Sequence, residues 1–93
     1  MERDSMAILM TNVVAGMPAT VYDQTIAGLS ELLRAADGFR GHFAGSTSDG
    51  NWSVIEIWDS AEQWATFFDA YVRPHLPPGN DPQIRELHHI LLA

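Results

Sequence analysis

Two segments of the 93-residue chain are apolar at both odd and even positions, and they limit the folds that the chain can adopt. The first is AILMTNVV at residues 7–14, and the second is WSVIEIW at residues 52–58. A strand points successive side chains to opposite faces of its sheet, so both segments predict a sheet that is covered on both faces. A chain of this length forms one domain with a thin core. We therefore expect a single domain over residues 1–93, in which the chain alone does not cover both faces of its sheet.

Two segments have the period of an amphipathic helix. Residues 20–37 begin with a capping-box pattern, Thr20 with Asp23, and a second capping box, Ser60 with Gln63, begins the other helix. Pro74 marks the end of the second helix. The first apolar stripe consists of Tyr22, Ile26, Leu29, Leu33 and Ala36. The second consists of Trp64, Phe67, Phe68, Tyr71 and Val72.

The remaining segments complete a regular order of elements. Residues 39–58 predict a hairpin, because Asp49-Gly50 supplies the positive φ of a tight turn. Residues 74–82 are rich in proline and predict an irregular segment, and residues 84–93 return to strand character. The order βαββαβ predicts an α+β, ferredoxin-like fold with a four-stranded antiparallel sheet and both helices on one face. We expect a second copy of the chain to cover the other face, giving a homodimer.

Charge and composition exclude several partners. The net charge is −7 with five basic residues, so neither nucleic acid nor an anionic membrane surface is expected as a partner. The chain has no Cys and therefore no disulfide or thiolate metal site. The N-terminal region lacks a signal-peptide pattern, and no apolar run approaches the roughly 18 residues of a membrane span. We expect a cytoplasmic protein with a frayed end at Met1–Ser5.

Side-chain alternation assigns residues to the two faces of the sheet. On the third strand, one face carries Trp52, Val54, Glu56 and Trp58. We expect the opposite face, with Ile55 and Ile57, to pack on the helices, so the Trp/Glu face should line a cavity on the dimer side. The same alternation places Asn12 and His42 on the cavity side and Phe43 on the helix side.

On the last strand, Glu86, His88 and Ile90 share a face, and we expect the opposite Leu face to pack on the helices. Polar groups from four strands then converge near Trp58: Asn12, His42, Glu56 and His88. As candidate catalytic residues, His42 or His88 would remove a proton while Glu56 holds the imidazole tautomer. The candidate substrate-binding residues are Asn12, Trp52, Val54 and Trp58.

Four stretches resemble a known family: GHFAG (41–45), DGNWSVIEIWDS (49–60), AEQWATFFDAYVRPHL (61–76) and LHHIL (87–91). The chain resembles the dimeric α+β barrel superfamily and, within it, small proteins of the antibiotic-biosynthesis monooxygenase type. The resemblance implies catalysis without a cofactor, with a Trp at the position of Trp58 and an Asn four residues earlier, where this chain has Val54. Haem-degrading relatives carry an Asn matched by Asn12, together with a Trp and an axial His near the positions of Phe67 and His75.

The resemblance and the residues together suggest a cofactor-independent enzyme with no bound metal. It would act on an aromatic polyketide-like or other small apolar molecule, by monooxygenation after proton abstraction in the barrel cavity. Antibiotic biosynthesis is the process implied. An oxygen-independent cyclase or isomerase and a non-catalytic ligand-binding or dimerisation module are the alternatives, so enzymatic activity stays open here. A metal site built from His42, His88 and Glu56 is a further alternative.

Overall fold

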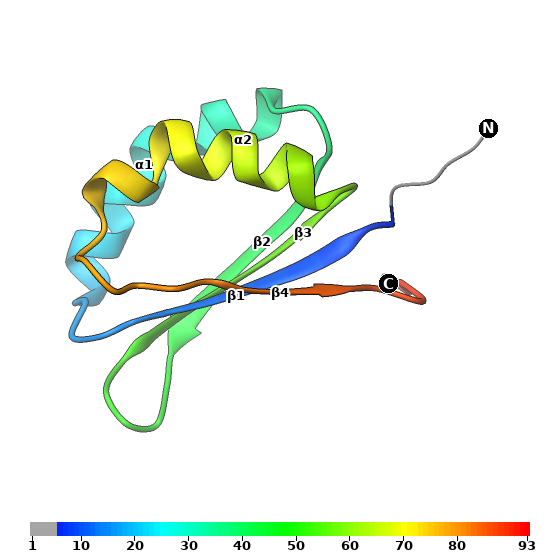
Figure 1. Ribbon diagram of the computed structural model, residues 1–93. Helices are drawn as coiled ribbons and strands as arrows, with labels where there is room; N and C mark the ends of the chain where they lie inside the picture. The colour runs from blue at the N-terminus through cyan, green and yellow to red at the C-terminus, as the bar shows by residue number, and fades with distance from the viewer. Residues whose placement is uncertain (1–5) are drawn as a thin grey trace.

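The structure of the protein, a computed structural model, describes residues 6–93 (Figure 1). The expected frayed end Met1–Ser5 lies outside the described residues. The elements follow the predicted βαββαβ order, with a short 3₁₀ turn, η1, before the last strand. They are β1 (Ile8–Val14), α1 (Ala19–Ala35), β2 (Phe39–Ser46), β3 (Trp52–Trp58), α2 (Ala61–Tyr71), η1 (Arg73–His75) and β4 (Gln83–Glu86).

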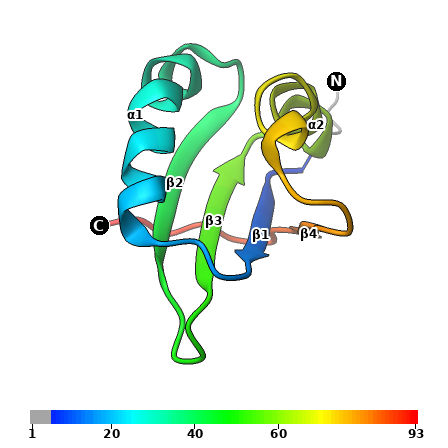
Figure 2. The same ribbon diagram turned by 90° about the vertical axis from the view of Figure 1, so that its left-hand side faces the viewer.

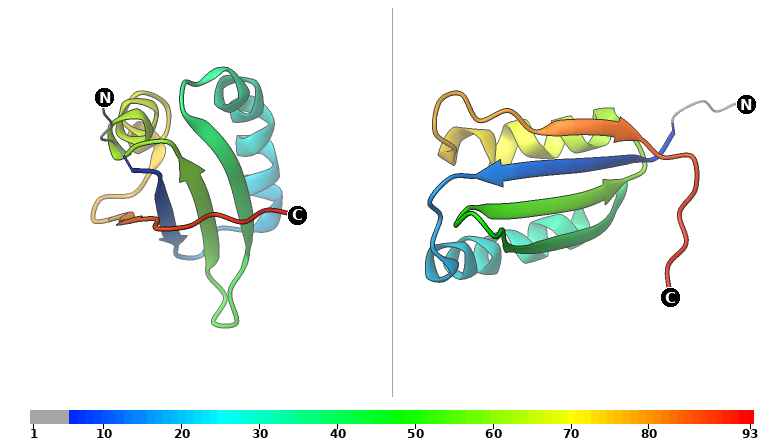
Figure 3. Two further views of the ribbon diagram at one scale, coloured as in Figure 1. Left: turned by 90° about the vertical axis from the view of Figure 1, so that its right-hand side faces the viewer. Right: turned by 90° about the horizontal axis from the view of Figure 1, so that it is seen from below.

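The four strands form one antiparallel sheet in the order β2-β3-β1-β4. Both helices lie on one side of this sheet, α1 beside β2 and α2 toward the side of β1 and β4 (Figures 1 and 2). Seen from below, the sheet has no helix in front of it (Figure 3). This is the predicted ferredoxin-like arrangement, with one helix-covered face and one bare face. Within residues 6–93, no helix combines the length and apolar character needed to span a bilayer.

The core lies between the sheet and the helices, and it shows that the prediction for the two faces was reversed. Trp58 is fully buried, and its ring packs between Phe39 at 5.4 Å and Phe67 at 5.6 Å, measured between ring centroids. The Trp/Glu side of β3 therefore faces the helices. The buried core cluster is Ile8, Met10, Leu33, Trp58, Trp64, Phe67 and Phe68.

The bare face carries the residues that were expected under the helices. Phe43 is 51% exposed and Val13 is 52% exposed, while Ile55 and Ile57 are only partly buried. Large aromatic side chains fill the deep space under two helices better than β-branched ones do, which explains the choice of face. The β-branched residues instead form a flat apolar surface on the opposite side.

The two predicted capping boxes have different outcomes. The Oγ of Ser60 accepts a hydrogen bond from the Gln63 amide at 3.1 Å, which confirms the cap of α2. The expected cap of α1 at Thr20 and Asp23 was wrong, because the helix already begins at Ala19 and Pro18 is the N-cap residue. The expected irregular segment after α2 includes the 3₁₀ turn η1, and α2 itself ends at Tyr71.

The last strand is shorter than predicted. It ends at Glu86, which pairs with Ile8, the first residue of β1. Beyond this point β1 offers no further strand residue for pairing, so residues 87–93 are not a strand and leave the end of the sheet (Figure 3). The expected Leu face of this segment consequently does not pack on the helices: Leu91 is 85% exposed.

Candidate functional site

A cavity of about 80 Å³ lies between the helix-covered face of the sheet and the two helices. Most of its wall is apolar and comes from β1, α1, α2 and the segment after α2. Six side chains with hydrogen-bonding groups also line it: Asn12, Tyr22, Thr25, His42, Glu56 and Trp64, whose indole nitrogen is buried without a partner among the described residues. A mostly apolar cavity with a few polar groups is typical of a small-molecule site.

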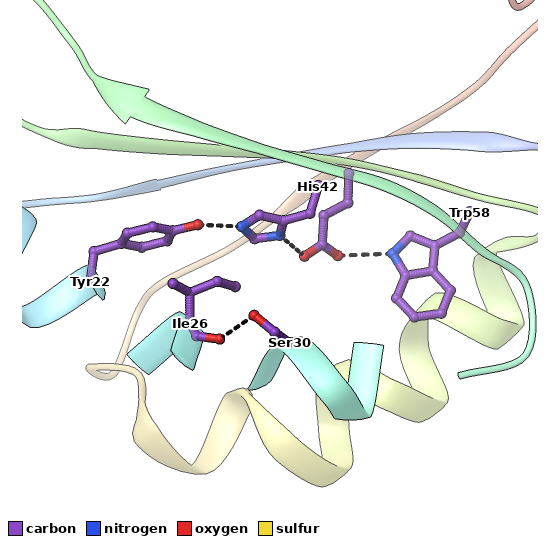
Figure 4. Close-up of polar contacts among 6 residues, drawn as sticks. Tyr22, Ile26, Ser30, His42 and Trp58 are labelled. Carbon is purple, nitrogen blue, oxygen red and sulfur yellow. Dashed lines mark hydrogen bonds and ion pairs between the residues drawn. The ribbon is translucent and has the colours of Figure 1, made fainter. Parts of the chain in front are cut away.

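A chain of hydrogen bonds runs along the cavity wall (Figure 4). The Oη of Tyr22 lies 2.6 Å from Nε2 of His42. The other ring nitrogen of His42, Nδ1, lies 2.7 Å from Oε2 of Glu56. The second carboxylate oxygen of Glu56 accepts a hydrogen bond of 2.8 Å from the indole nitrogen of Trp58. We call these four residues the polar chain.

The register of the sheet brings the three strand residues of the polar chain together. His42 and Glu56 are direct partners across β2 and β3, and Glu56 and Trp58 share a face because they are two residues apart. Alternation and the strand order predicted that these three side chains converge, and the structure brings them together. The cavity they line is under the helices, not on the dimer side as expected.

Tyr22 is the member of the polar chain that sequence reasoning missed. It was assigned to the apolar stripe of α1, and its ring does pack against Trp52 with the centroids 5.0 Å apart. A tyrosine on the inner face of a helix still needs a partner for its hydroxyl group, and a facing histidine is a suitable acceptor. That requirement is the signal that could have linked Tyr22 to His42.

Burial and charge indicate which groups donate and which accept in the polar chain. The side chains of His42 and Glu56 are 16% and 10% exposed, so an ionised Glu56 depends on its two donors. With Glu56 ionised and His42 neutral, Nδ1 of His42 carries the proton and Nε2 accepts from the Tyr22 hydroxyl. Burial, and then the negative charges of Glu56 and Asp23, raise the pKa of the Tyr22 phenol.

Asn12 supplies a second polar group on the cavity wall. It is 6% exposed, and no hydrogen bond to its side chain is present among residues 6–93. Its partner across β1 and β3 is Val54, which also lines the cavity and lies between Asn12 and the polar chain on the sheet. Asn12, Val54 and Tyr22 therefore all face the same cavity.

Two of the predicted substrate-binding residues do not line the cavity. Trp58 is buried beneath it and donates to Glu56. Trp52 packs against the ring of Tyr22, and its indole nitrogen is buried without a partner among the described residues. Both tryptophans support residues that face the cavity, whereas Asn12 and Val54 form its surface.

His88 does not join the site. It lies beyond the end of β4 in a bend and is exposed, because the strand expected to carry it ends at Glu86. The expected convergence of four polar groups is therefore wrong for His88. The metal alternative also loses its third ligand, and across residues 6–93 no three His, Asp or Glu side chains are grouped to hold an ion.

Fold and cavity define a ferredoxin-like α+β protein with an internal, mostly apolar cavity. Neither a family model nor a curated protein sequence matches the chain. Among solved structures, it is similar to SnoaB, a cofactor-independent oxygenase from Streptomyces nogalater, with a TM-score of 0.61 and 15% identity over 96% of this chain and 98% of that one. The chain thus has the fold of antibiotic-biosynthesis-monooxygenase-like proteins, as the sequence predicted.

Two further solved structures share this fold. The monooxygenase from the gene ActVA-Orf6 of Streptomyces coelicolor, in complex with Nanaomycin D, has a TM-score of 0.56 and 20% identity over 96% of this chain and 92% of that one. A heme-degrading protein from Mycobacterium tuberculosis, in a heme-free form, has a TM-score of 0.70 and 14% identity over 97% of this chain and 100% of that one.

The residues suggested by the haem-degrading resemblance do not form a haem pocket. Asn12 and Phe67 line the cavity, but His75 is exposed on η1 and does not. The cavity volume of about 80 Å³ is several times below the roughly 300–1,000 Å³ of pockets for drug-sized ligands. The inner cavity therefore has neither the volume nor the histidine of a haem pocket.

The link between Glu56 and Tyr22 predicts a change in the phenol titration. Glu56→Gln should lower the pKa of Tyr22, because one of the negative charges that raises it is removed while burial remains. An absorbance titration measures this in a Tyr71→Phe background, which leaves Tyr22 as the sole tyrosine because the chain has 2. Glu31→Gln, on the exposed surface of α1, is the control and should leave the titration unchanged. An unchanged pKa in Glu56→Gln would contradict the coupling.

Proposed function

We propose that the protein is a cofactor-independent monooxygenase for a flat hydroxyaromatic molecule of polyketide type with an activated CH₂ group. The observation that carries this proposal is the polar chain, which ends at the cavity surface in the hydroxyl group of Tyr22. A neutral imidazole held by a carboxylate is a general base suited to removing a weakly acidic proton. The apolar remainder of the cavity suits one end of the ring system of such a substrate.

Proton abstraction passes through Tyr22 in this proposal. The substrate gives its proton to the phenolic oxygen while the phenol gives its own proton to Nε2 of His42. The imidazolium that results is stabilised by the carboxylate of Glu56, whose position is fixed by Trp58. Tyr22 thus stays neutral overall, which agrees with the burial and charges that raise the pKa of its phenol.

The carbanion formed from the CH₂ group then reacts with dioxygen. One oxygen atom becomes the carbonyl oxygen of the product and the other leaves as water, so the four electrons lost by the carbon reduce one molecule of dioxygen. During deprotonation, negative charge moves to an oxygen substituent of the ring. Asn12, whose amide has no partner among the described residues, would donate a hydrogen bond to this oxygen.

The similarity to SnoaB and to the ActVA-Orf6 monooxygenase supports this reaction class. A role in antibiotic biosynthesis is part of the same proposal. In monooxygenases of this type the resemblance implies an Asn where this chain has Val54. We infer that Asn12 and the polar chain replace that group here. Val54 would then serve as a smooth apolar floor under the ring of the substrate.

The proposed assembly is a homodimer through the bare face of the sheet. Phe43 and Val13 are half exposed there and lie on the same side as Ile55 and Ile57. An apolar face of this kind favours burial against a second copy. The cavity lies on the other side of the sheet, so each protomer would keep its own site.

Glu56→Gln tests the proposed chemistry. With anthrone as the substrate, the wild-type protein should take up one dioxygen per anthraquinone formed, and the variant should be slower by about one to two orders of magnitude. The physical reason is that the amide cannot stabilise the imidazolium. An oxygen electrode and quinone absorbance measure the rate, with Glu31→Gln as the control and a protein-free sample for autoxidation.

Other outcomes of the anthrone experiment identify the alternatives. Equal turnover in Glu56→Gln and wild type would remove Glu56 from the mechanism. Conversion of the substrate without oxygen uptake would point to a cyclase or isomerase. Binding without any conversion would point to a ligand-binding module.

Phe43→Glu tests the dimer. The substitution places a charge on the bare face, so a dimer seen by light scattering for the wild type should dissociate at the same micromolar concentration. Leu32→Glu is the matched control, because Leu32 is an exposed apolar residue on α1 and not on the sheet. A folded wild-type monomer under these conditions would refute the proposed assembly.

A further inference from the structure

A second hollow lies outside the cavity, between α1 and the C-terminal end of α2 with η1. We call it the outer groove; its volume is about 390 Å³. Four residues line the outer groove but not the inner cavity: Val21, Gly28, Tyr71 and His75. Five further residues line both the outer groove and the inner cavity: Met17, Thr25, Leu29, Val72 and Leu76. The two spaces are therefore separated only by side chains, among them the flexible Met17.

The inner cavity is too small for the substrate of the proposed function by itself. A water molecule takes a share of about 30 Å³ in the liquid, so about 80 Å³ accommodates only one end of an aromatic molecule. Pockets for drug-sized ligands have volumes of roughly 300–1,000 Å³, a range that the outer groove reaches with about 390 Å³. A longer ligand with its polar end inside would extend past the shared wall, which includes Met17 and Leu76, into the groove.

Gly28 indicates that the outer groove is kept open. Glycine is among the least favourable residues in a helix interior, and Gly28 lies in the middle of α1. Its backbone does not have the positive φ that would require glycine, and a methyl group added there would meet no heavy atom within 4 Å. Neither backbone conformation nor packing within the chain accounts for this glycine. Its effect is to leave room beside the helix backbone for a bound group.

The side chains around Gly28 are suited to an apolar group. Val21 is 45% exposed and Tyr71 is 43% exposed, although both are large and apolar. They face a groove whose shared wall with the inner cavity is also mostly apolar. We propose that the outer groove binds the apolar body of a ligand whose oxygenated end lies in the inner cavity, against Tyr22 and Asn12. The position of the oxygenated end rests on the proposed function, whereas the apolar subsite stands on the groove itself.

A series of phenols with lengthening chains tests this subsite by binding alone. Phenol, 4-ethylphenol, 4-butylphenol and 4-hexylphenol are titrated into the protein, and dissociation constants are measured by NMR. In the wild type, each methylene group that enters the groove should tighten binding by about twofold to fourfold, because apolar surface is buried. An affinity that does not rise with chain length while phenol itself binds would overturn the subsite and leave the inner site intact.

Gly28→Phe fills the outer groove without reaching the inner cavity, whose lining does not include Gly28. It should weaken 4-hexylphenol binding by about tenfold or more and leave phenol binding unchanged. Gly28→Ala is the matched control and should bind like the wild type. Val21→Trp blocks the groove from another position, in case Gly28→Phe folds poorly. Equal binding of 4-hexylphenol by folded blocking variants and wild type would overturn the proposal.

The design separates failure of the subsite from failure of the proposed function. Oxygen uptake with anthrone reports on the reaction, whereas the phenol series reports only on binding. Chain-length dependence without oxygen uptake would retain the subsite and reject the monooxygenase. If neither phenol nor any longer member binds, the subsite is rejected together with the assignment of the oxygenated end to Tyr22 and Asn12.

Discussion

The burial of the Glu56 carboxylate is the constraint on which the rest of the site depends. A carboxylate in the middle of a helix-covered sheet is strongly unfavourable unless donors replace the water that it loses. Trp58 and His42 are those donors, at 2.8 Å and 2.7 Å. Because both nitrogens of the imidazole are then engaged, Tyr22 is held at the cavity surface, where its hydroxyl group is available to a ligand. One buried charge thus orients three other side chains, those of Trp58, His42 and Tyr22.

The sequence predicted the order of elements, the antiparallel sheet and the location of His42 and Glu56 on the same side of it, because these follow from local signals and from strand alternation. It left open whether His42 or His88 is the partner of Glu56. It could not predict which face the helices cover, since both faces of β3 are apolar and alternation gives only relative sides. That choice depends on how Trp58 fits against Phe39 and Phe67, which are far from it in the sequence. The end of β4 depends likewise on where β1 begins.

Because the cavity lies under the helices, the proposed ligand site and the proposed dimer interface are on different faces of the sheet. The bare face is not covered by a helix and is available to a second copy of the chain, while the helix-covered face carries the polar chain and the cavity that shares a wall with the outer groove. In the proposed account, dimerisation and ligand binding would therefore use opposite sides of the same strands. In the proposed account, β3 serves both: Ile55 and Ile57 face the partner, and Glu56 faces the ligand.

The tautomer of His42 is the most direct test of this account. Two-dimensional ¹H–¹⁵N NMR correlations of the ring nitrogens report which nitrogen carries the proton in the neutral imidazole. The polar chain predicts a single tautomer with the proton on Nδ1 and an unprotonated Nε2, whereas exposed His88 serves as the reference for a solvated ring in the same spectrum. A proton on Nε2 of His42, or a mixture of tautomers like that of His88, would contradict the hydrogen-bonded arrangement and the proton path built on it.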